Sequence, residues 1–435
     1  MQPRDGGPVD QAIELVHRAD RARVLAGLIG LLRDFDLAEE ALQDAFVAAF
    51  EAWPKTGIPV NPAAWLTTTA RRKAIDRIRR AAARDRRQRE WGELSVAWTS
   101  GSPADAIVDD RLRLIFTCCH PALSIEAQIA LTLRTLGGLS TAEVARAFVI
   151  AEPTLAQRLV RAKRKIKDSA IPYRVPDPAE LPERLDAVLA VITLIFNAGY
   201  LPGDGSAVVR ADLCEEAKRL AVLLADLLPH EPEPIALVAL LQLLDSRRAA
   251  RADENGRPLT LEEQDREVWD RAQILTALQL LERVATLGPP GPYALKAGIA
   301  AVHASTRHPA DTDWPRIVDL YDQLLLVEPT PVVALNRCVA VAMTSSPEDG
   351  LRLLDEPDLA GALGQYHHYH LTRADLLRRA GRAREAAIAY EAARTRTDNR
   401  AEHEFVDRRL EELSLRSGGP ISHPMRGAAA ANRQG

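Results

Sequence analysis

The stretch Leu139–Lys167, LSTAEVARAFVIAEPTLAQRLVRAKRKIK, carries the sharpest structural signal in the chain. Ser140 and Glu143 have the spacing of a capping box, in which each side chain bonds the backbone N–H of the other residue, so a short helix should begin here. After a turn at residues 149–152, Pro153 suits the first turn of a second helix. The inner face of that helix would carry Leu155, Leu159 and Ala162. The pattern predicts a helix-turn-helix.

The second helix of this motif would turn a cationic face outward. Residues 158–168 hold six Lys or Arg against one Asp. Its first polar side chains would reach base edges in a major groove, and its later cations would hold phosphates. The candidate contacts to duplex DNA are Ser140, Thr141, Thr154, Gln157, Arg158, Arg161, Lys163, Arg164 and Lys167. The alternative is an amphipathic helix pair whose charged face is only solvated.

A second cationic block lies nearer the N-terminus. Residues 71–90 hold ten Lys or Arg against three Asp or Glu, behind a helix start at Asn61-Pro62. An aromatic ring beside a cationic helix suits a single strand, because bases stack on the ring while the backbone follows the charge. The candidates are Trp65, Arg71, Arg72, Lys73, Arg77, Arg79 and Arg80. The alternative is that Trp65 packs in the core and the arginines are solvated.

The helix before this block should begin at Asp36, with Glu39 in the capping-box position, and end near Trp53-Pro54, because proline disfavours helix in the residue before it. The composition also favours helices throughout, since alternating Val/Ile/Thr runs are scarce. At roughly 150 residues per domain, the 435 residues correspond to about three domains. The net charge of -4 places both cationic blocks in an otherwise acidic chain, which indicates specific anionic partners.

Features of other protein classes are weak. The four cysteines form no CxxC pair, which favours a reducing cytoplasm over a disulfide framework. The polar start Met1–Asp10 does not resemble a signal peptide, and the apolar run Ala187–Phe196 is shorter than the ~20 residues that span a bilayer. We expect a cytoplasmic protein without a membrane partner.

Neither catalytic nor metal chemistry is predicted. No P-loop, GxGxxG, HExxH or GxSxG motif occurs, so the expectation is a non-enzyme without cofactors. The adjacent cysteines in Cys118-Cys119-His120 lack the spacing of a zinc site. His367 and His370 lie one helical turn apart but make an incomplete pair, so we expect no metal site.

The C-terminal part shows a repeat. Tyr321-Asp322 and Tyr390-Glu391 lie 69 residues apart, and each precedes a break and a new helix, Pro331–Met343 and Arg400–Leu413. This spacing is about twice the 34-residue tetratricopeptide period. Stacked helix pairs form extended binding surfaces, so this part is expected to regulate activity through a protein or ligand partner.

The N-terminal segments Asp36–Trp53 and Pro62–Arg80 resemble region two of extracytoplasmic-function sigma factors, and residues 106–169 resemble region four of that family. The segments FTCCHPAL (116–123), FNAGY (196–200) and LCEEA (213–217) resemble a branch of that family with a long, tetratricopeptide-like C-terminal extension.

The resemblance implies roles for these segments. The Trp65–Arg80 helix would melt and hold the -10 promoter element, and the helix-turn-helix would read the -35 element. The helix Asp36–Glu51 would dock on core RNA polymerase through Glu39, Glu40, Gln43 and Asp44.

The expected fold is all-α, with two small sigma modules and a large helical, repeat-like C-terminal domain. The expected boundaries are 9–83 for the region-two module, 84–105 for a linker, 106–170 for the region-four module, 171–182 for a Pro-rich connector, 183–290 for a helical extension, 291–415 for the repeats and 416–435 for a disordered tail. The expected function is that of an alternative sigma factor that binds core RNA polymerase and promoter DNA. The alternatives are a helix-turn-helix regulator with a C-terminal sensing domain, and a helical scaffold whose basic helices are incidental.

Overall fold

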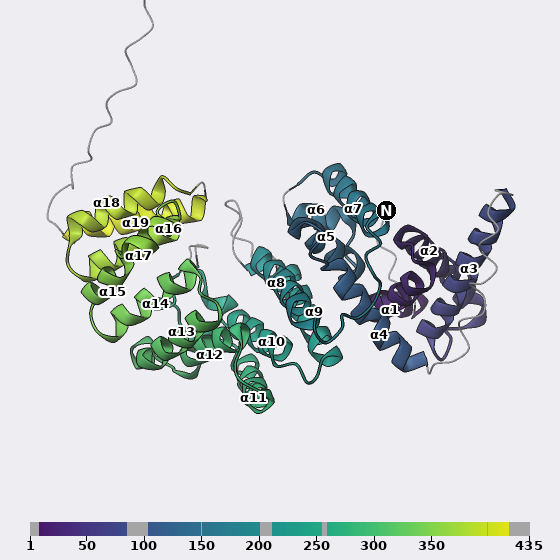
Figure 1. Ribbon diagram of the computed structural model, residues 1–435, viewed down its shortest axis with the longest axis horizontal. Helices are drawn as coiled ribbons and strands as arrows, with labels where there is room; N and C mark the ends of the chain where they lie inside the picture. The colour runs from purple at the N-terminus through teal and green to yellow at the C-terminus, as the bar shows by residue number, and fades with distance from the viewer. Residues whose placement is uncertain are drawn as a thin grey trace, which may run out of the picture. The chain divides into compact units, whose positions relative to one another are not determined.

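The computed structural model describes residues 8–84, 103–148, 150–200, 211–254, 259–397 and 399–416 (Figure 1). The regular structure of these segments is helical, and no β-strand occurs in them, which confirms the predicted all-α class. Most of the predicted linker 84–105 and of the tail 416–435 lies outside the described residues. The chain divides into two compact units, one formed by residues 1–199 and 210–228 and the other by residues 200–209 and 229–435.

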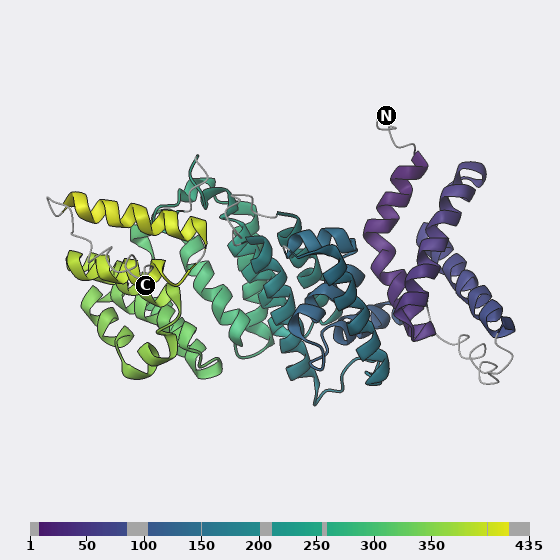
Figure 2. The same cartoon turned by 90° about the horizontal axis from the view of Figure 1, so that it is seen from above.

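The first unit contains nine helices among its described residues. They are α1 (Pro8–Leu32), α2 (Phe35–Thr56), α3 (Pro62–Arg84), α4 (Pro103–Cys118), α5 (Ile125–Thr135), α6 (Thr141–Ala147), α7 (Glu152–Asp168), α8 (Leu181–Tyr200) and α9 (Ala211–Leu227). α1 packs on α2, α3 and α4, as the two views in Figures 1 and 2 show. Leu25, Leu42, Trp53 and Leu66 are almost fully buried in this core.

The start and the end of α2 differ from the prediction. Asp34, in extended conformation, is the N-cap instead of Asp36, and its Oδ1 accepts from the backbone N–H groups of Asp36 and Leu37 at 3.0 Å each. The helix also continues through Pro54 to Thr56, because the N–H of Gly57 bonds the Trp53 carbonyl at 3.0 Å and closes the last turn.

The predicted Pro-rich connector runs inside the first unit. The Tyr173 hydroxyl lies 2.7 Å from the Ala26 carbonyl oxygen and 3.1 Å from that of Asp110, so it joins α1 to α4. Burial, followed by the charge of Asp110, raises the pKa of Tyr173, so it stays a donor. Farther along the chain, Arg219 of α9 donates to the Leu136 carbonyl after α5 at 2.7 Å. The two sigma-like modules and the first extension helices therefore form one packed body.

The second unit is built from consecutive helix pairs. Its helices are α10 (Pro232–Asp245), α11 (Arg271–Leu287), α12 (Pro292–Ser305), α13 (Trp314–Val327), α14 (Pro331–Thr344), α15 (Pro347–Leu354), α16 (Pro357–Leu363), α17 (His367–Arg379), α18 (Ala383–Arg394) and α19 (Arg400–Arg416), with three short 3-10 helices at Arg248–Ala250, Arg266–Val268 and Pro309–Asp311. Helices α14 and α19 match the two predicted repeat helices. Tyr390, 1% exposed, lies in the core that α14 to α19 share.

Candidate nucleic-acid interface

The helix-turn-helix forms from the local contacts that its sequence predicts. The Ser140 N–H donates to Glu143 Oε2 at 2.7 Å, and the Glu143 N–H donates to Ser140 Oγ at 3.2 Å, which completes the capping box at the start of α6. Across the turn, the Ile150 N–H bonds the Ala145 carbonyl at 3.1 Å. The inner side of α7 buries Leu155, Leu159, Ala162 and Ile166.

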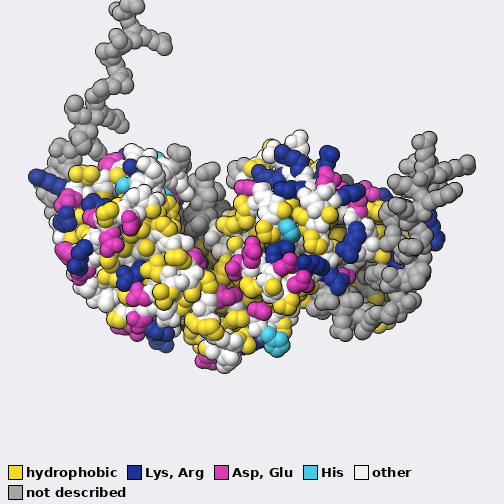
Figure 3. Space-filling model, in the orientation of Figure 1, with side chains coloured by type: hydrophobic (Ala, Val, Ile, Leu, Met, Phe, Trp, Pro, Cys, Tyr) yellow, Lys and Arg dark blue, Asp and Glu magenta, His cyan; other side chains and the backbone are white. Residues whose placement is uncertain are grey.

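The outer side of α7 is partly open and strongly cationic, and Lys and Arg side chains gather over it in Figure 3. Arg158 is half-buried, and Thr141 is half-buried at the preceding helix start. Arg164 pairs with Asp168 of the same helix at 3.2 Å. The exposed candidates at this motif are Ser140, Thr154, Gln157, Arg161, Arg164 and Lys167.

Lys163 is not part of this open surface. Its ammonium lies 2.8 Å from Asp36 and 3.0 Å from Glu39, both on α2, and its side chain is only 12% exposed. Lys167 also approaches Asp34, at 3.7 Å. These pairs form where the acidic start of α2 lies against cationic side chains of α7. Two predicted phosphate contacts are thus engaged within the protein.

Among the predicted polymerase contacts, only some are exposed. Glu39 is 13% exposed and lies against Lys163, so the expectation that it sits on the exposed side of α2 is wrong. Glu40 pairs with Arg77 of α3, and Asp44 accepts from the same guanidinium at 2.8 and 3.1 Å. Gln43 is exposed. The hydrogen bond to Asp44 is the main cause that raises the pKa of Arg77.

The α3 helix carries the predicted single-strand platform. The half-buried Trp65 packs edge-on against the buried Trp53, with ring centroids 5.6 Å apart, so part of the ring belongs to the core. Arg72 and Arg79 are exposed, whereas Arg71 and Lys73 are half-buried. Arg77 is held by α2 as described above, and the side chain of Arg80 lies outside the described residues. Arg77 therefore links α3, which carries the predicted single-strand platform, to the acidic side chains of α2.

Two residues of this surface were missed by the sequence reasoning. Lys165 is exposed on α7. It could have been identified from the sequence, because residues four positions apart, here Arg161 and Lys165, lie on the same face of a helix. Asp34 was missed as a partner of Lys167 because that contact joins helices far apart in sequence. The discarded zinc candidates, Cys118 and Cys119, are buried against the hydroxyls of Thr135 and Thr132 at 3.3 and 3.5 Å. Burial raises the pKa of Cys119 to about 12.

Comparison with known proteins assigns these modules. Residues 16–84 match the model of sigma-70 region 2, residues 113–166 match that of sigma-70 region 4, and residues 184–285 match a family of unknown function, DUF6596. The chain is 30% identical to the ECF RNA polymerase sigma factor SigK of Mycobacterium ulcerans (strain Agy99), over 34% of this chain and 79% of that protein. The SigK protein of Mycobacterium tuberculosis (strain ATCC 25177 / H37Ra) gives 30% identity over 34% of this chain and 80% of that protein.

The chain belongs to the ECF RNA polymerase sigma factor family. It is an alternative sigma factor, which directs RNA polymerase to promoters. The similarity extends through the C-terminal part in another relative. Uncharacterized protein R00370 of Rhizobium meliloti (strain 1021) is 41% identical over 92% of this chain and 96% of that protein. Among the described residues, no helix is long and apolar enough to cross a membrane.

Proposed function

We propose that the open face of α7 reads the -35 promoter element as duplex DNA. The observation that supports this most directly is the capped helix-turn-helix whose second helix leaves Thr154, Gln157 and Arg161 exposed. Such side chains at the start of a recognition helix reach base edges, while cations farther along hold phosphates. Lys165 is added to this surface, and Lys163 joins it only when its pairs with α2 open.

The test uses holoenzyme assembled from core polymerase and the full chain, bound to promoter duplex. We expect Arg161→Ala to weaken binding and to remove discrimination against -35 mutations, since one good base contact contributes about 1–3 kcal/mol. Arg307→Ala, which removes an equal charge from an exposed position in the second unit, is the matched control. Equal binding by both variants would refute the assignment.

The α3 helix is proposed to hold the melted -10 element. Melting requires a site that binds unstacked bases more tightly than paired ones. Trp65 offers a ring on which a base can stack, and the exposed Arg72 and Arg79 offer cations for the phosphates. Permanganate reactivity of thymines in the open complex would measure this. We expect Trp65→Ala to lower the reactivity at the -10 element without preventing duplex binding; unchanged reactivity would count against the platform.

Core polymerase is proposed to bind the exposed side of α2 through Glu40, Gln43 and Asp44. Because Arg77 covers two of these carboxylates, docking would compete with the α2–α3 ion pairs. The protein would act in the cytoplasm, where the polymerase and the chromosome lie. No catalytic role is proposed, in keeping with a family of non-enzymatic transcription factors.

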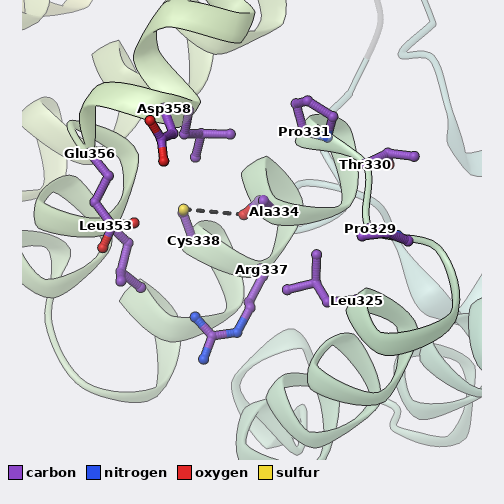
Figure 4. Close-up of a pocket in the computed structure, with 11 residues that line it drawn as sticks. Leu325, Pro329, Thr330, Pro331, Ala334, Arg337, Cys338, Leu353, Glu356 and Asp358 are labelled. Carbon is purple, nitrogen blue, oxygen red and sulfur yellow. Dashed lines mark hydrogen bonds between the residues drawn. The ribbon is translucent and has the colours of Figure 1, made fainter.

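The second unit is proposed to regulate the sigma modules by binding a protein or small-molecule partner. Its helix pairs support this role, as does a pocket of about 360 Å³ between α13, α14, α15 and α16. Figure 4 shows the pocket walls, with apolar Leu325 and Leu353 and charged Arg337, Glu356 and Asp358.

Truncation tests this regulatory role. The cut belongs after Leu228, since an earlier one would remove α9 from the first unit. A truncated chain that transcribes and responds to its inducing signal like the full chain would exclude regulation by this unit.

A further inference from the structure

Three side chains with metal-ligating atoms meet in the second unit, outside the sites discussed above. His367 and His368 stand at the start of α17, and Glu402 stands in the first turn of α19. One ligand atom from each residue lies within 4.8 Å of the others. His370, which stands one helical turn after His367, lies outside this group, and its Nε2 lies 2.9 Å from the Gly364 carbonyl oxygen. We propose that His367, His368 and Glu402 bind a divalent transition-metal ion of the zinc type.

The spacing of two of these ligands already suits a metal ion. His367 Nε2 and Glu402 Oε2 are 3.1 Å apart. Zinc binds nitrogen and oxygen ligands at 2.0–2.2 Å, so two ligands of a tetrahedral ion lie about 3.3 Å apart. The His368 imidazole lies beside that of His367, with ring centroids 3.8 Å apart and ring planes tilted by 39°, and a rotamer adjustment would let it share the ion.

His367 has a buried nitrogen that the protein does not satisfy. Its Nε2 forms no hydrogen bond, although the Glu402 Oε2 atom lies 3.1 Å away. Buried polar atoms without partners are costly and rare in folded proteins. An ion placed between the imidazole and the carboxylate would bind the lone pair of this nitrogen and remove the cost.

The surroundings orient the ligands as an outer shell does in metal sites. The Thr397 hydroxyl donates to Glu402, and the Thr397 carbonyl contacts His403 Nε2 at 2.8 Å, which fixes the segment before α19. The ring of Tyr366 packs edge-on against both imidazoles, at 5.8 and 5.2 Å.

The ligand set identifies the class of ion. Two imidazoles and a carboxylate suit zinc and its neighbours in the first transition series better than magnesium or calcium, which prefer oxygen ligands only. Three protein ligands leave a fourth position for water, which distinguishes this site from closed structural zinc sites. A bound ion would join the start of α17 to α19 and stabilise the last helix pairs of the second unit.

The test uses the full chain, purified without a polyhistidine tag and stripped of metal with a chelator. Titration with Co²⁺, followed by its visible absorption, and with Zn²⁺, followed by calorimetry, measures the site. We expect one ion per chain with a tetrahedral cobalt spectrum, and a rise in the Tm of the second unit with zinc. Absence of a tetrahedral spectrum in the wild-type chain would overturn the proposal.

Variants then locate the ion. Glu402→Gln keeps the size of the side chain and its ability to accept from Thr397, so the metal-free variant should melt like the wild type. We expect Glu402→Gln and His367→Ala to lower metal affinity at least tenfold. His308→Ala, at an exposed histidine outside the cluster, should change nothing. Equal affinity in Glu402→Gln and wild-type chains would refute the site and leave only a histidine–glutamate ion pair.

Discussion

Replacing Glu39 with glutamine removes the carboxylate that holds Lys163 against α2. Both side chains are largely buried, at 13% and 12% exposure, and their charged atoms are 3.0 Å apart. The same ammonium also contacts Asp36 at 2.8 Å, but that side chain is 71% exposed. Glu39→Gln and Asp36→Asn each remove one carboxylate from Lys163. The two substitutions should therefore change the free energy of unfolding by different amounts.

The magnitudes follow from burial. Removing one partner of a fully buried ion pair costs about 3–5 kcal/mol, because the other charge is left uncompensated. Here Asp36 remains beside Lys163, so we expect Glu39→Gln to lower the free energy of unfolding of the first unit by about 1–3 kcal/mol. An exposed pair contributes about 0–1 kcal/mol, which sets the expectation for Asp36→Asn. Urea denaturation followed by circular dichroism measures both values.

Glu39→Gln leaves Lys163 paired only with the exposed Asp36, so a phosphate competes more easily for its ammonium. Each added phosphate contact steepens the salt dependence of duplex binding by about 0.9 in log K against log [salt]. Fluorescence anisotropy of promoter duplex with Glu39→Gln across a salt series should show this change, and Lys163→Met should abolish it. Equal stability losses in Glu39→Gln and Asp36→Asn, with an unchanged salt slope, would refute the reasoning.

Three further predictions concern packing and pH. Tyr173→Phe should destabilise the first unit by about 1–3 kcal/mol, since the one hydroxyl hydrogen shared by two carbonyl oxygens is lost; an unchanged denaturation midpoint would contradict the α1–α4 link. Gly350→Ala places a Cβ 2.6 Å from that of Ala342 and should cost about 1–3 kcal/mol, whereas Gly361→Ala, with open space, should be neutral or stabilising in the same melts. Burial lowers the pKa of His303 from 6.5 to about 4, so the unfolded chain binds the proton first and stability should fall as pH drops from about 6.5 to 4; His303→Gln should lack this fall in pH-dependent denaturation.

Local chemistry made much of the fold predictable. The capping box at Ser140 and Glu143, the helix start at Pro62 and the buried face of α7 all depend on residues within a few positions of one another. The repeat helices α14 and α19 were found through a spacing within the sequence. Asp34 was missed as the cap of α2 because Asp36 stands in an equally suitable residue pattern, and only the backbone decides between them.

Contacts between distant segments could not be predicted. The helical periodicity of the sequence places Glu39 and Lys163 on the polar faces of their helices. It does not show that these two faces contact one another, as they do in the structure. The same holds for Glu402, whose approach to His367 depends on how α18 returns the chain to α17. Three-dimensional packing thus removed Glu39 from the expected polymerase surface and placed His368 and Glu402, rather than His370, beside His367 in the candidate metal site.

Transcription in vitro with purified core RNA polymerase tests the central claim most directly. The full chain is supplied as the only specificity subunit, on a template carrying the region upstream of its own gene. We expect discrete initiation that requires both the polymerase and this chain, and that the double substitution Arg158→Ala/Arg161→Ala abolishes. Duplex binding without polymerase, combined with no initiation from any form of the chain, would contradict it and favour a conventional helix-turn-helix regulator.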